Sequence, residues 1–387
     1  MARADRAARL TLFAAVAGWA TGFSVLSIER HRAFETGRFD LGNMVQAVWS
    51  TAHGHVLQVT NLHGAQVSRL GAHVDPILIV FAPLWWLWPS PSLLLTAQAI
   101  VVAGLGIWYA LGRRRWAAGG AIAATGIGAT ILAIDVVIPH FRHGAASSFF
   151  GRYDAVGGSA GGIVHKAFTD PGKLLSVAFD HRGAHYLLDL LLPIIVLAAL
   201  APLMLVALVP ELALNLLSSV DAQKSIHFHY VAGEIPILFA AAAIGLGRLG
   251  RWAGMAGTAA VLATLVANYA LGPIPLWRFV PGGATFQAKS AHVSRHDRIA
   301  ARELGLIPAE AVVSATNSLG AHLSARRRVF SFPHLRGAQW VAVDERRPSL
   351  GDHYDQKGGL ERIEQFRRDK RFRLVSAADG VLVFKER

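Results

Sequence analysis

Long apolar runs separated by short polar segments fill the first 280 residues of this 387-residue chain. About 20 apolar residues are needed to cross the hydrocarbon core of a bilayer. Four runs approach this length and predict membrane-spanning helices: residues 10–28, 117–138, 231–247 and 252–271. The first run stays apolar as far as Ile28, past a candidate cleavage site at residues 18–20, which favours an uncleaved helix over a signal peptide. The pattern predicts a polytopic, mainly α-helical membrane domain over residues 1–280.

Two further apolar stretches are interrupted by proline. Residues 76–111 contain a Pro-Ser-Pro-Ser sequence at 89–92, and residues 186–217 contain three prolines. Irregular backbone at membrane depth is tolerated only where protein or water covers it. These stretches are therefore either kinked spans or segments that line a cavity, and the sequence leaves both interpretations open.

Arginine clusters orient the predicted spans, because Lys and Arg in short loops favour the cytoplasmic side. The clusters lie at residues 3–9, 113–115 and 248–251. With these clusters inside, the loops 29–75 and 139–185 lie outside, together with the C-terminal tail. All 17 histidines fall in these outer segments or at their edges, which supports a single polar face on the outer side of the plasma membrane.

The composition changes near residue 287 to that of a soluble α/β domain. Residues 294–304 and 360–370 have the spacing of amphipathic helices. The expected strands are residues 311–315, 328–332, 339–344, 372–375 and 381–384, the last two joined by a hairpin turn at 378–380. About 100 residues can bury a modest core. The sequence therefore predicts an extracytoplasmic α/β domain over residues 287–387.

Composition supports the membrane assignment and restricts the chemistry. Hydrophobic residues make up 53% of the chain and charged residues 16%, with a mean hydropathy of +0.39, whereas a soluble domain carries about a quarter charged residues. The absence of cysteine excludes disulfides and thiolate chemistry. A net charge of +13 is typical of a surface that attracts anionic membrane lipids. Nucleic acid is the other common partner of such charge, but no basic-aromatic or helix-turn-helix pattern supports it.

Two acids outside the first polar loop have ordinary structural interpretations. Glu211 lies in apolar surroundings, where acids tend to be paired or functional, and Asn215 one turn later is its expected hydrogen-bond partner. Asp344 ends a predicted strand, where α/β sites often lie, but as a lone residue it is more typical of a turn former.

An ordered set of motifs carries a resemblance to a known family. It includes Phe-Asp-Leu-Gly at 39–42, Ser-Arg-Leu-Gly-Ala-His at 68–73, Ile-Pro-His-Phe at 138–141 and Trp-Val-Ala-Val-Asp at 340–344. Together these motifs resemble a family of bacterial predicted membrane proteins, the domain of unknown function 2079. That family is similar in layout to polytopic glycosyltransferases that use polyprenyl-phosphate-linked sugars. Family members have several more hydrophobic spans where this chain passes directly from Gln98 towards Ile138, so the chain resembles a shortened member.

The resemblance implies a role for Asp40, because those glycosyltransferases place an essential acid in the first outer loop. Asp40 would act as the general base on the acceptor hydroxyl. Asp is also a favoured N-cap residue. Capping of a helix that starts near Leu41 is therefore the alternative, and the two roles are compatible.

Lipid-linked glycosyl transfer also needs positive charge at the departing phosphate. The candidate phosphate partners are Arg69, Arg152 and Lys224. The candidate ligands of a divalent metal are His73, Asp75 and His229. Asp75 before Pro76 is equally a helix-start signal, and each basic residue alone is more typical of a surface charge.

The sequence favours a multi-pass plasma-membrane protein of the glycosyltransferase-like type. It would act on a polyprenyl-phosphate-linked sugar at the outer face, and the shortened middle leaves its activity open. The alternative is a non-enzymatic binding or transport component that recognises an anionic ligand. An inverted repeat would favour transport, and the sequence shows none. A truncated relic is the third interpretation.

Overall fold

The computed structural model describes residues 2–98, 131–145, 147–192, 194–272, 274–284, 292–349 and 361–387, together with Thr125, Gly128, Ala129 and Asp352. The chain forms two compact units. Unit 1 comprises Met1–Ser147 and Ser290–Arg387, and unit 2 comprises Ser148–Lys289. The beginning of the chain and the tail therefore belong to one unit, which the sequence-based division at residues 280–287 does not anticipate.

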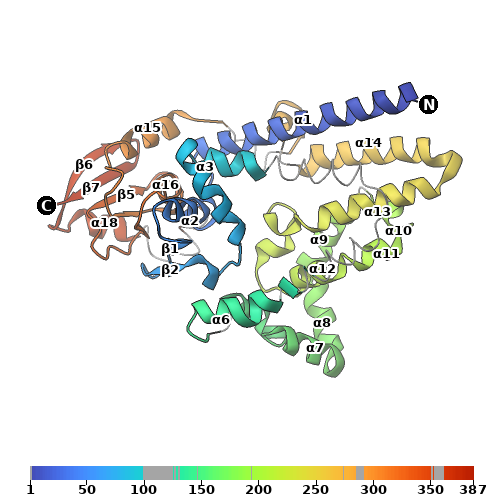
Figure 1. The fold of residues 1–387 in the computed structure, drawn as a ribbon, viewed down its shortest axis with the longest axis horizontal. Coiled ribbons are helices and arrows are strands. Elements are labelled where there is room, and N and C mark those ends of the chain that lie inside the picture. The colour runs from blue at the N-terminus through green and yellow to red at the C-terminus, as the bar shows by residue number, and fades with distance from the viewer. Residues whose placement is uncertain are drawn as a thin grey trace. The chain divides into compact units, whose positions relative to one another are not determined.

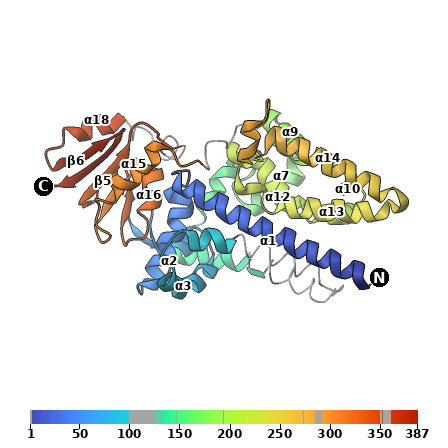
Figure 2. The ribbon, with the colours of Figure 1, turned by 90° about the horizontal axis from the view of Figure 1, so that it is seen from above.

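Helix α1 (Ala2–Arg32) is a single rod of 31 residues in unit 1 (Figures 1 and 2). It passes through residues 18–20 without a break and exposes apolar side chains, with Leu10 at 62% and Val25 at 55%. Its last turn is basic, which complements the negative end of the helix dipole. His31 in that turn is buried, so the C-terminal end of α1 packs into the unit.

The predicted outer loop 29–75 is folded into short elements that continue into the next apolar segment. These elements are η1 (Arg38–Gly42), α2 (Asn43–Ala52), β1 (Gln58–Thr60), β2 (Gln66–Ser68), η2 (Arg69–Gly71), η3 (Pro76–Val80) and α3 (Phe81–Leu87). Strands β1 and β2 pair antiparallel. Helix α2 is amphipathic, and its buried Val45 and Val48 pack in one core with Leu57, Leu78 and Trp85. The loop therefore shares a hydrophobic core with the apolar segment that follows it.

The tail is an α/β domain built on a five-stranded sheet. The strands are β3 (Val313–Ala315), β4 (Val329–Ser331), β5 (Trp340–Asp344), β6 (Phe372–Ala378) and β7 (Val381–Glu386), in the order β4-β3-β5-β7-β6. Strand β3 runs parallel to β4 and β5, and β7 runs antiparallel to β5 and β6. The helices are α15 (Arg295–Leu304), α16 (Asn317–His322) and α18 (Glu361–Arg367). The predicted α/β domain is confirmed, with its elements shifted by a few residues at their ends.

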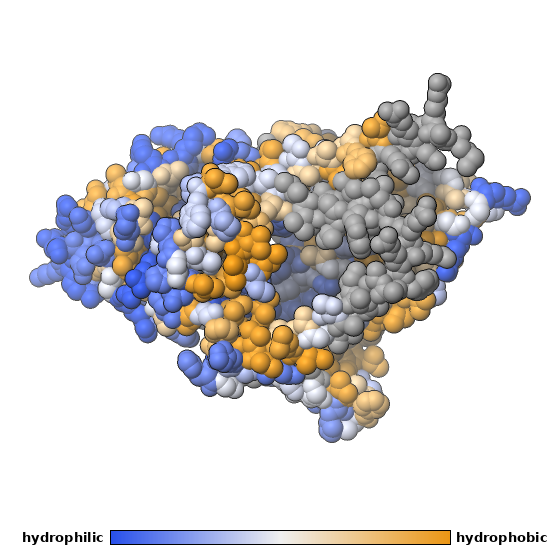
Figure 3. Space-filling model, in the orientation of Figure 1, coloured by the Kyte–Doolittle hydropathy of each residue, from blue (hydrophilic) through white to orange (hydrophobic). Residues whose placement is uncertain are grey.

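The hairpin predicted at 378–380 is also confirmed. Asp379 and Gly380 have φ values of 51° and 86°, and a type I′ turn requires positive φ at both central residues. One hydrophobic cluster packs Leu319 and Leu323 of the α16 segment on the sheet, and a second packs Phe366 of α18. The outer surface of this domain is mainly hydrophilic (left in Figure 3).

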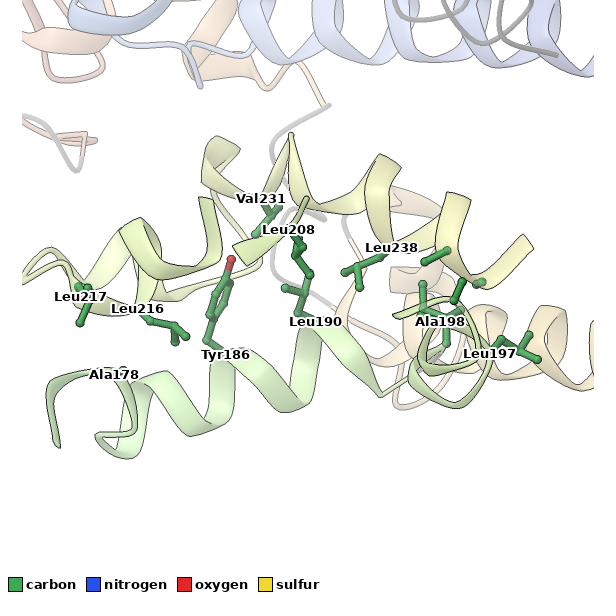
Figure 4. Packing of buried hydrophobic residues seen from close by; sticks show 14 of the residues in the cluster. Ala178, Tyr186, Leu190, Leu197, Ala198, Leu208, Leu216, Leu217, Val231 and Leu238 are labelled. Atoms are coloured by element: carbon green, nitrogen blue, oxygen red, sulfur yellow. The ribbon is translucent and has the colours of Figure 1, made fainter. Parts of the chain in front are cut away.

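Unit 2 is built of helices, and two short elements of unit 1, η4 (Ala133–Val137) and α6 (Ile138–Phe141), precede it. Its elements are η5 (Ser148–Val156), α7 (Ala160–Thr169), α8 (Pro171–Ala178), α9 (His181–Leu191), α10 (Ile195–Ala199), α11 (Pro202–Val206), α12 (Val209–Leu217), η6 (Asp221–Lys224), η7 (His229–Val231), α13 (Glu234–Arg248), η8 (Gly250–Trp252), α14 (Ala253–Leu271) and η9 (Pro275–Phe279). Tyr186, Leu190, Leu208 and Leu238 point toward one another in its core (Figure 4). The predicted outer loop 139–185 is thus largely helical.

The described part of the apolar stretch 186–217 contains the second half of α9 and the short helices α10, α11 and α12. Pro202 is the first residue of α11, and Pro210 lies in the first turn of α12. These are the positions where a missing N–H costs a helix no hydrogen bond. The stretch is therefore a set of short packed helices rather than one continuous span.

Two helical stretches among the described residues are long and apolar enough to cross a membrane, judged by length and composition: His229–Arg248 and Gly250–Leu271. They correspond to the predicted spans 231–247 and 252–271. Half of the predicted span 117–138, together with the arginines at 113–115, lies outside the described residues. Pro76–Leu87 is a shorter apolar helix. The multi-pass arrangement therefore stays a prediction beyond these two helices.

Candidate functional site

The start of loop 29–75 is anchored on the tail by a fully buried arginine, Arg38. Its Nε donates to Ser331 Oγ (2.8 Å), and its Nη1 donates to the carbonyl oxygens of Thr60 and Val329 (both 3.1 Å). Its backbone N–H donates to Asn317 Oδ1 (2.9 Å). These contacts join the loop to β4 and α16 of the α/β domain.

Gln46 of α2 makes a second connection between the same parts. Its Nε2 donates to the carbonyl oxygens of Arg326 (3.2 Å) and Arg327 (3.0 Å), and its Oε1 accepts from the Thr60 N–H (2.9 Å). Gln46 is 1% exposed. The loop and the tail therefore share a polar, hydrogen-bonded interface in unit 1.

Asp40 lies two residues after the Arg38 anchor, and its side chain is exposed. The helical run begins at Arg38, with Gly37 as the cap residue of η1, so Asp40 lies inside the first turn instead of at the N-cap position. A carboxylate in that turn is favoured by the helix dipole. A Cβ on Gly37 would lie 3.0 Å from Asp40 Oδ2 and 2.8 Å from Asn317 Nδ2, which places Asp40 close to the N-terminus of α16.

Arg69 and Asp75, predicted as phosphate partner and metal ligand, pair with each other. Arg69 Nε lies 3.0 and 2.9 Å from the two carboxylate oxygens, and Nη2 lies 2.7 Å from Oδ2. The Arg69 side chain is 4% exposed. A phosphate at Arg69 or a metal at Asp75 would therefore compete with a bidentate ion pair. His73 lies between them in the sequence and is exposed, and its backbone N–H donates to Arg69 O (2.9 Å).

The predicted metal ligands are distributed over both units, His73 and Asp75 in unit 1 and His229 in unit 2. Within the described ranges, no group of three or more His, Asp or Glu side chains is arranged to hold a metal ion. His229 is exposed and packs beside Tyr230, with ring centroids 4.2 Å apart. The metal site stays a prediction.

Lys224, a predicted phosphate partner, is buried in unit 2. Its Nζ donates to Val177 O (2.7 Å) and Asp180 Oδ2 (2.8 Å). Asp180 also caps α9, because its Oδ1 accepts from the Gly183 N–H (2.7 Å). Partial burial raises the pKa of Asp180, but the Lys224 and Gly183 hydrogen bonds outweigh this effect and hold the pKa below its usual value. Asp180 is therefore ionised at neutral pH.

A pocket of about 430 Å³ lies around this pair. The cationic side chains Lys173, Arg182 and Lys224 line it, together with the hydroxyl groups of Ser218 and Ser219. Asp180 and Asp221 contribute two carboxylates to the same lining. Arg182 forms an ion pair with Asp221. The pocket thus presents several hydrogen-bond donors and a small excess of positive charge.

Arg152, the third predicted phosphate partner, belongs to a polar network in the same unit. Its Nη1 donates to Gln223 Oε1 (3.1 Å), and its guanidinium lies 4.6 Å from the centroid of the Phe149 ring. Gln223 Oε1 also accepts from Ser218 Oγ (2.7 Å). Because Ser218 lines the pocket, Arg152 connects to it through two hydrogen bonds.

The expected pairing of Asn215 with Glu211 is wrong. Asn215 Nδ2 donates to Glu234 Oε1 (3.0 Å) and to Tyr230 O (3.0 Å), and the hydroxyl of Tyr186 also donates to Glu234. Glu211 instead accepts a hydrogen bond from the Gly233 backbone N–H. Glu234 is fully buried. No local spacing rule could have identified partners 19 and 48 residues away in the chain.

Asp344 has the turn-forming role that the sequence indicates and a second role that it does not. Its Oδ1 accepts from the backbone N–H groups of Arg346 and Arg347 (both 3.0 Å). Its Oδ2 lies 2.8 Å from His296 Nε2, and the other ring nitrogen of His296 lies 3.1 Å from Asp379 Oδ2. This arrangement ties α15 to β5 and to the hairpin turn.

The fold is that of a mainly helical protein whose small α/β domain packs on its first polar loop. The model of the family described as "Predicted membrane protein (DUF2079)" matches residues 30–103 and 93–383. The chain belongs to this family. The two matched segments meet at residues 93–103, beside the region where the sequence resemblance indicates missing spans. No curated protein and no solved structure matches the chain.

Proposed function

We propose that this membrane protein binds a phosphate-bearing ligand of the polyprenyl-phosphate class in the pocket of unit 2. The observation that carries the proposal is the lining of that pocket by Lys173, Arg182 and the buried Lys224. Its volume of about 430 Å³ lies in the range of small-molecule sites, about 300 to 1,000 Å³. The predicted phosphate partners Lys224 and Arg152 belong to this pocket and the network beside it.

The charge balance favours an anionic ligand. Lys224 is held by Asp180 and Arg182 by Asp221, and Lys173 brings the third positive charge. A phosphate would accept charge-assisted hydrogen bonds from these groups and from the serine hydroxyls. The same unit contains the two helices that could cross a membrane, which supports a lipid-linked rather than a freely soluble ligand. The outward orientation of the site and of the α/β domain is part of the proposal.

Replacing Lys173 and Arg182 together with alanine is expected to weaken binding of a short-chain polyprenyl phosphate at least tenfold. Each lost charge-assisted contact contributes about 1 kcal/mol or more, and about 1.4 kcal/mol corresponds to a factor of ten. The measurement is titration calorimetry of the purified chain in detergent. Lys166→Ala is the matched control, because Lys166 lies on α7, is paired with Asp170 and does not line the pocket. Equal affinity in the double variant and the wild type would remove the pocket from the proposal.

Glycosyl transfer with Asp40 as general base is the second candidate function. Its support is the exposed carboxylate of Asp40, held in the first turn of a helix whose first residue is the buried Arg38. A general base must be reachable by the acceptor hydroxyl, and this exposure meets that condition. The substrate class is inferred from the resemblance in layout to polytopic glycosyltransferases.

Asp40→Asn is expected to reduce transfer from a polyprenyl-phosphate-linked sugar by on the order of 10²-fold or more, since general base catalysis contributes about that much. The assay is release of radiolabelled sugar from the lipid donor by membranes that contain the protein. Glu35→Gln is the control, because Glu35 is another exposed acid of the same loop. Transfer at the wild-type rate in Asp40→Asn would exclude the catalytic role of Asp40.

A further inference from the structure

The buried guanidinium of Arg38 connects the starting points of two surface turns in unit 1. One turn joins β1 to β2 and begins after Thr60, whose carbonyl accepts from Arg38 Nη1 (3.1 Å). The other follows β4 and begins at Ser331, whose hydroxyl accepts from Arg38 Nε (2.8 Å). The two turns are therefore held side by side by one cation.

The turns also touch at their surface. Gly64 has φ of 76°, and a Cβ at this position would lie 2.7 Å from Arg336 Cδ and 3.3 Å from Arg336 Nε. The second turn is closed by the His334 N–H, which donates to Ser331 O (2.8 Å). The contact between Gly64 and Arg336 brings the neighbouring His63 of the first turn close to His334 and Arg336 of the second.

Within the part of the chain that the structure describes, no acid forms an ion pair with Arg38. Among the described residues, its guanidinium donates hydrogen bonds to two backbone carbonyls and one hydroxyl. Its Nη2 is buried and has no hydrogen-bond partner among the described residues. Burial lowers the pKa of Arg38 to about 9, so the side chain remains protonated at neutral pH. A buried charge without a counter-ion is costly, and a bound anion would remove that cost.

Three of the groups that act on His334 are arginines. Burial lowers its pKa most, followed by Arg336, His63, Arg362 and Arg38. Repulsion among gathered cations destabilises the unliganded protein, and it becomes attraction when an anion binds between them. A purely structural role of Arg38 explains its three hydrogen bonds but leaves this gathering of cations on the same two turns unexplained.

We propose that the two turns form a second anion site, in unit 1, for a phosphate group. Arg336, His334 and His63 would contact the phosphate at the surface, and Arg38 would supply fixed positive charge beneath them. Arginine matches phosphate oxygens in a fork, and the N–H group of each imidazole donates a further hydrogen bond. The phosphate belongs either to a lipid headgroup or to a soluble ligand. The site is separate from the pocket of unit 2 and does not depend on it.

The test is titration of the purified full chain with inorganic phosphate, read by calorimetry. The double variant His334→Ala/Arg336→Ala is expected to bind phosphate at least tenfold more weakly than the wild type. Both residues are exposed, so the variant should keep the thermal stability of the native fold. Arg328→Ala is the control for charge alone, because Arg328 is an exposed arginine of the same domain outside the two turns. The double variant Lys173→Ala/Arg182→Ala separates this site from the pocket of unit 2. It should keep the phosphate binding that His334→Ala/Arg336→Ala loses.

Vesicles distinguish the two sources of phosphate. Stronger binding of the wild type than of the double variant to phosphatidylglycerol, with equal weak binding to phosphatidylcholine, would indicate a lipid headgroup. Phosphate binding without this lipid preference would indicate a soluble ligand. The proposal fails if the double variant binds phosphate as tightly as the wild type, or if neither binds it.

Discussion

Replacement of Arg38 with methionine is expected to lower the free energy of unfolding of unit 1 by about 3 kcal/mol. Methionine fills a similar volume but leaves the carbonyls of Thr60 and Val329 and the hydroxyl of Ser331 without their donor. Each buried acceptor without a partner costs about 1 to 3 kcal/mol. Removal of an unbalanced buried charge offsets part of this cost, which is why we expect a smaller loss than the sum.

Hydrogen exchange of the amides in β4 and α16 is the measurement, because both elements receive contacts from Arg38. Arg328→Met serves as the comparison, since Arg328 is exposed in the same domain. Its expected effect is within about 0.5 kcal/mol, as for most surface substitutions. If Arg38→Met exchanges no faster than Arg328→Met, the anchor does not stabilise the interface between the loop and the tail.

The tail illustrates what the sequence can predict. Its strands are short runs of apolar and β-branched residues bounded by turn residues, and Asp379 and Gly380 supply the backbone conformation that a tight hairpin needs. Such information is local, so it can be read from consecutive residues. Proline positions are equally local, and the prolines at 202 and 210 mark helix starts in the structure.

The packing of the first loop on the tail could not be predicted in the same way. Arg38 and Ser331 are separated by 293 residues, and no pattern along the chain links them. Arginine is almost never fully buried unless it is paired, so nothing along the chain singles out Arg38 as the residue that organises the interface. The sequence analysis likewise treats Arg69 and Asp75 as ligands of two different groups. The two residues lie six positions apart and form an ion pair with each other.

Acidification is expected to destabilise unit 1 through a stacked pair of histidines. His31 at the end of α1 stacks on His322 of α16, with ring centroids 4.1 Å apart and planes inclined by 6°. Phe34 stacks on His322 as well, at 3.8 Å. Burial lowers the pKa of His31 to about 4, and burial together with the neighbouring His31 lowers that of His322 to about 3.

The direction of the pH effect follows from these pKa values. Both histidines are neutral in the folded protein at neutral pH, and they bind protons more readily in the unfolded chain, near pH 6.5. Their contribution to stability is therefore fully present above pH 6.5 and is lost as the pH falls toward 4 and 3. For His31 alone, the difference between 6.5 and about 4 corresponds to roughly 3 kcal/mol of stability.

The pH dependence of hydrogen exchange in α16, followed from pH 7.5 to about 5, measures this effect. The wild type should lose protection steadily below pH 6.5, whereas His31→Phe/His322→Phe keeps three stacked aromatic rings and should lose less. Comparison of the two slopes removes the contribution of carboxylates, which titrate equally in both proteins. His292→Gln is the control, because His292 is an exposed histidine of the same unit and its loss should leave the slope of the wild type unchanged. Identical slopes in the wild type and the double variant would mean that the stack stays folded when protonated, and that the end of α1 is held on α16 by other contacts.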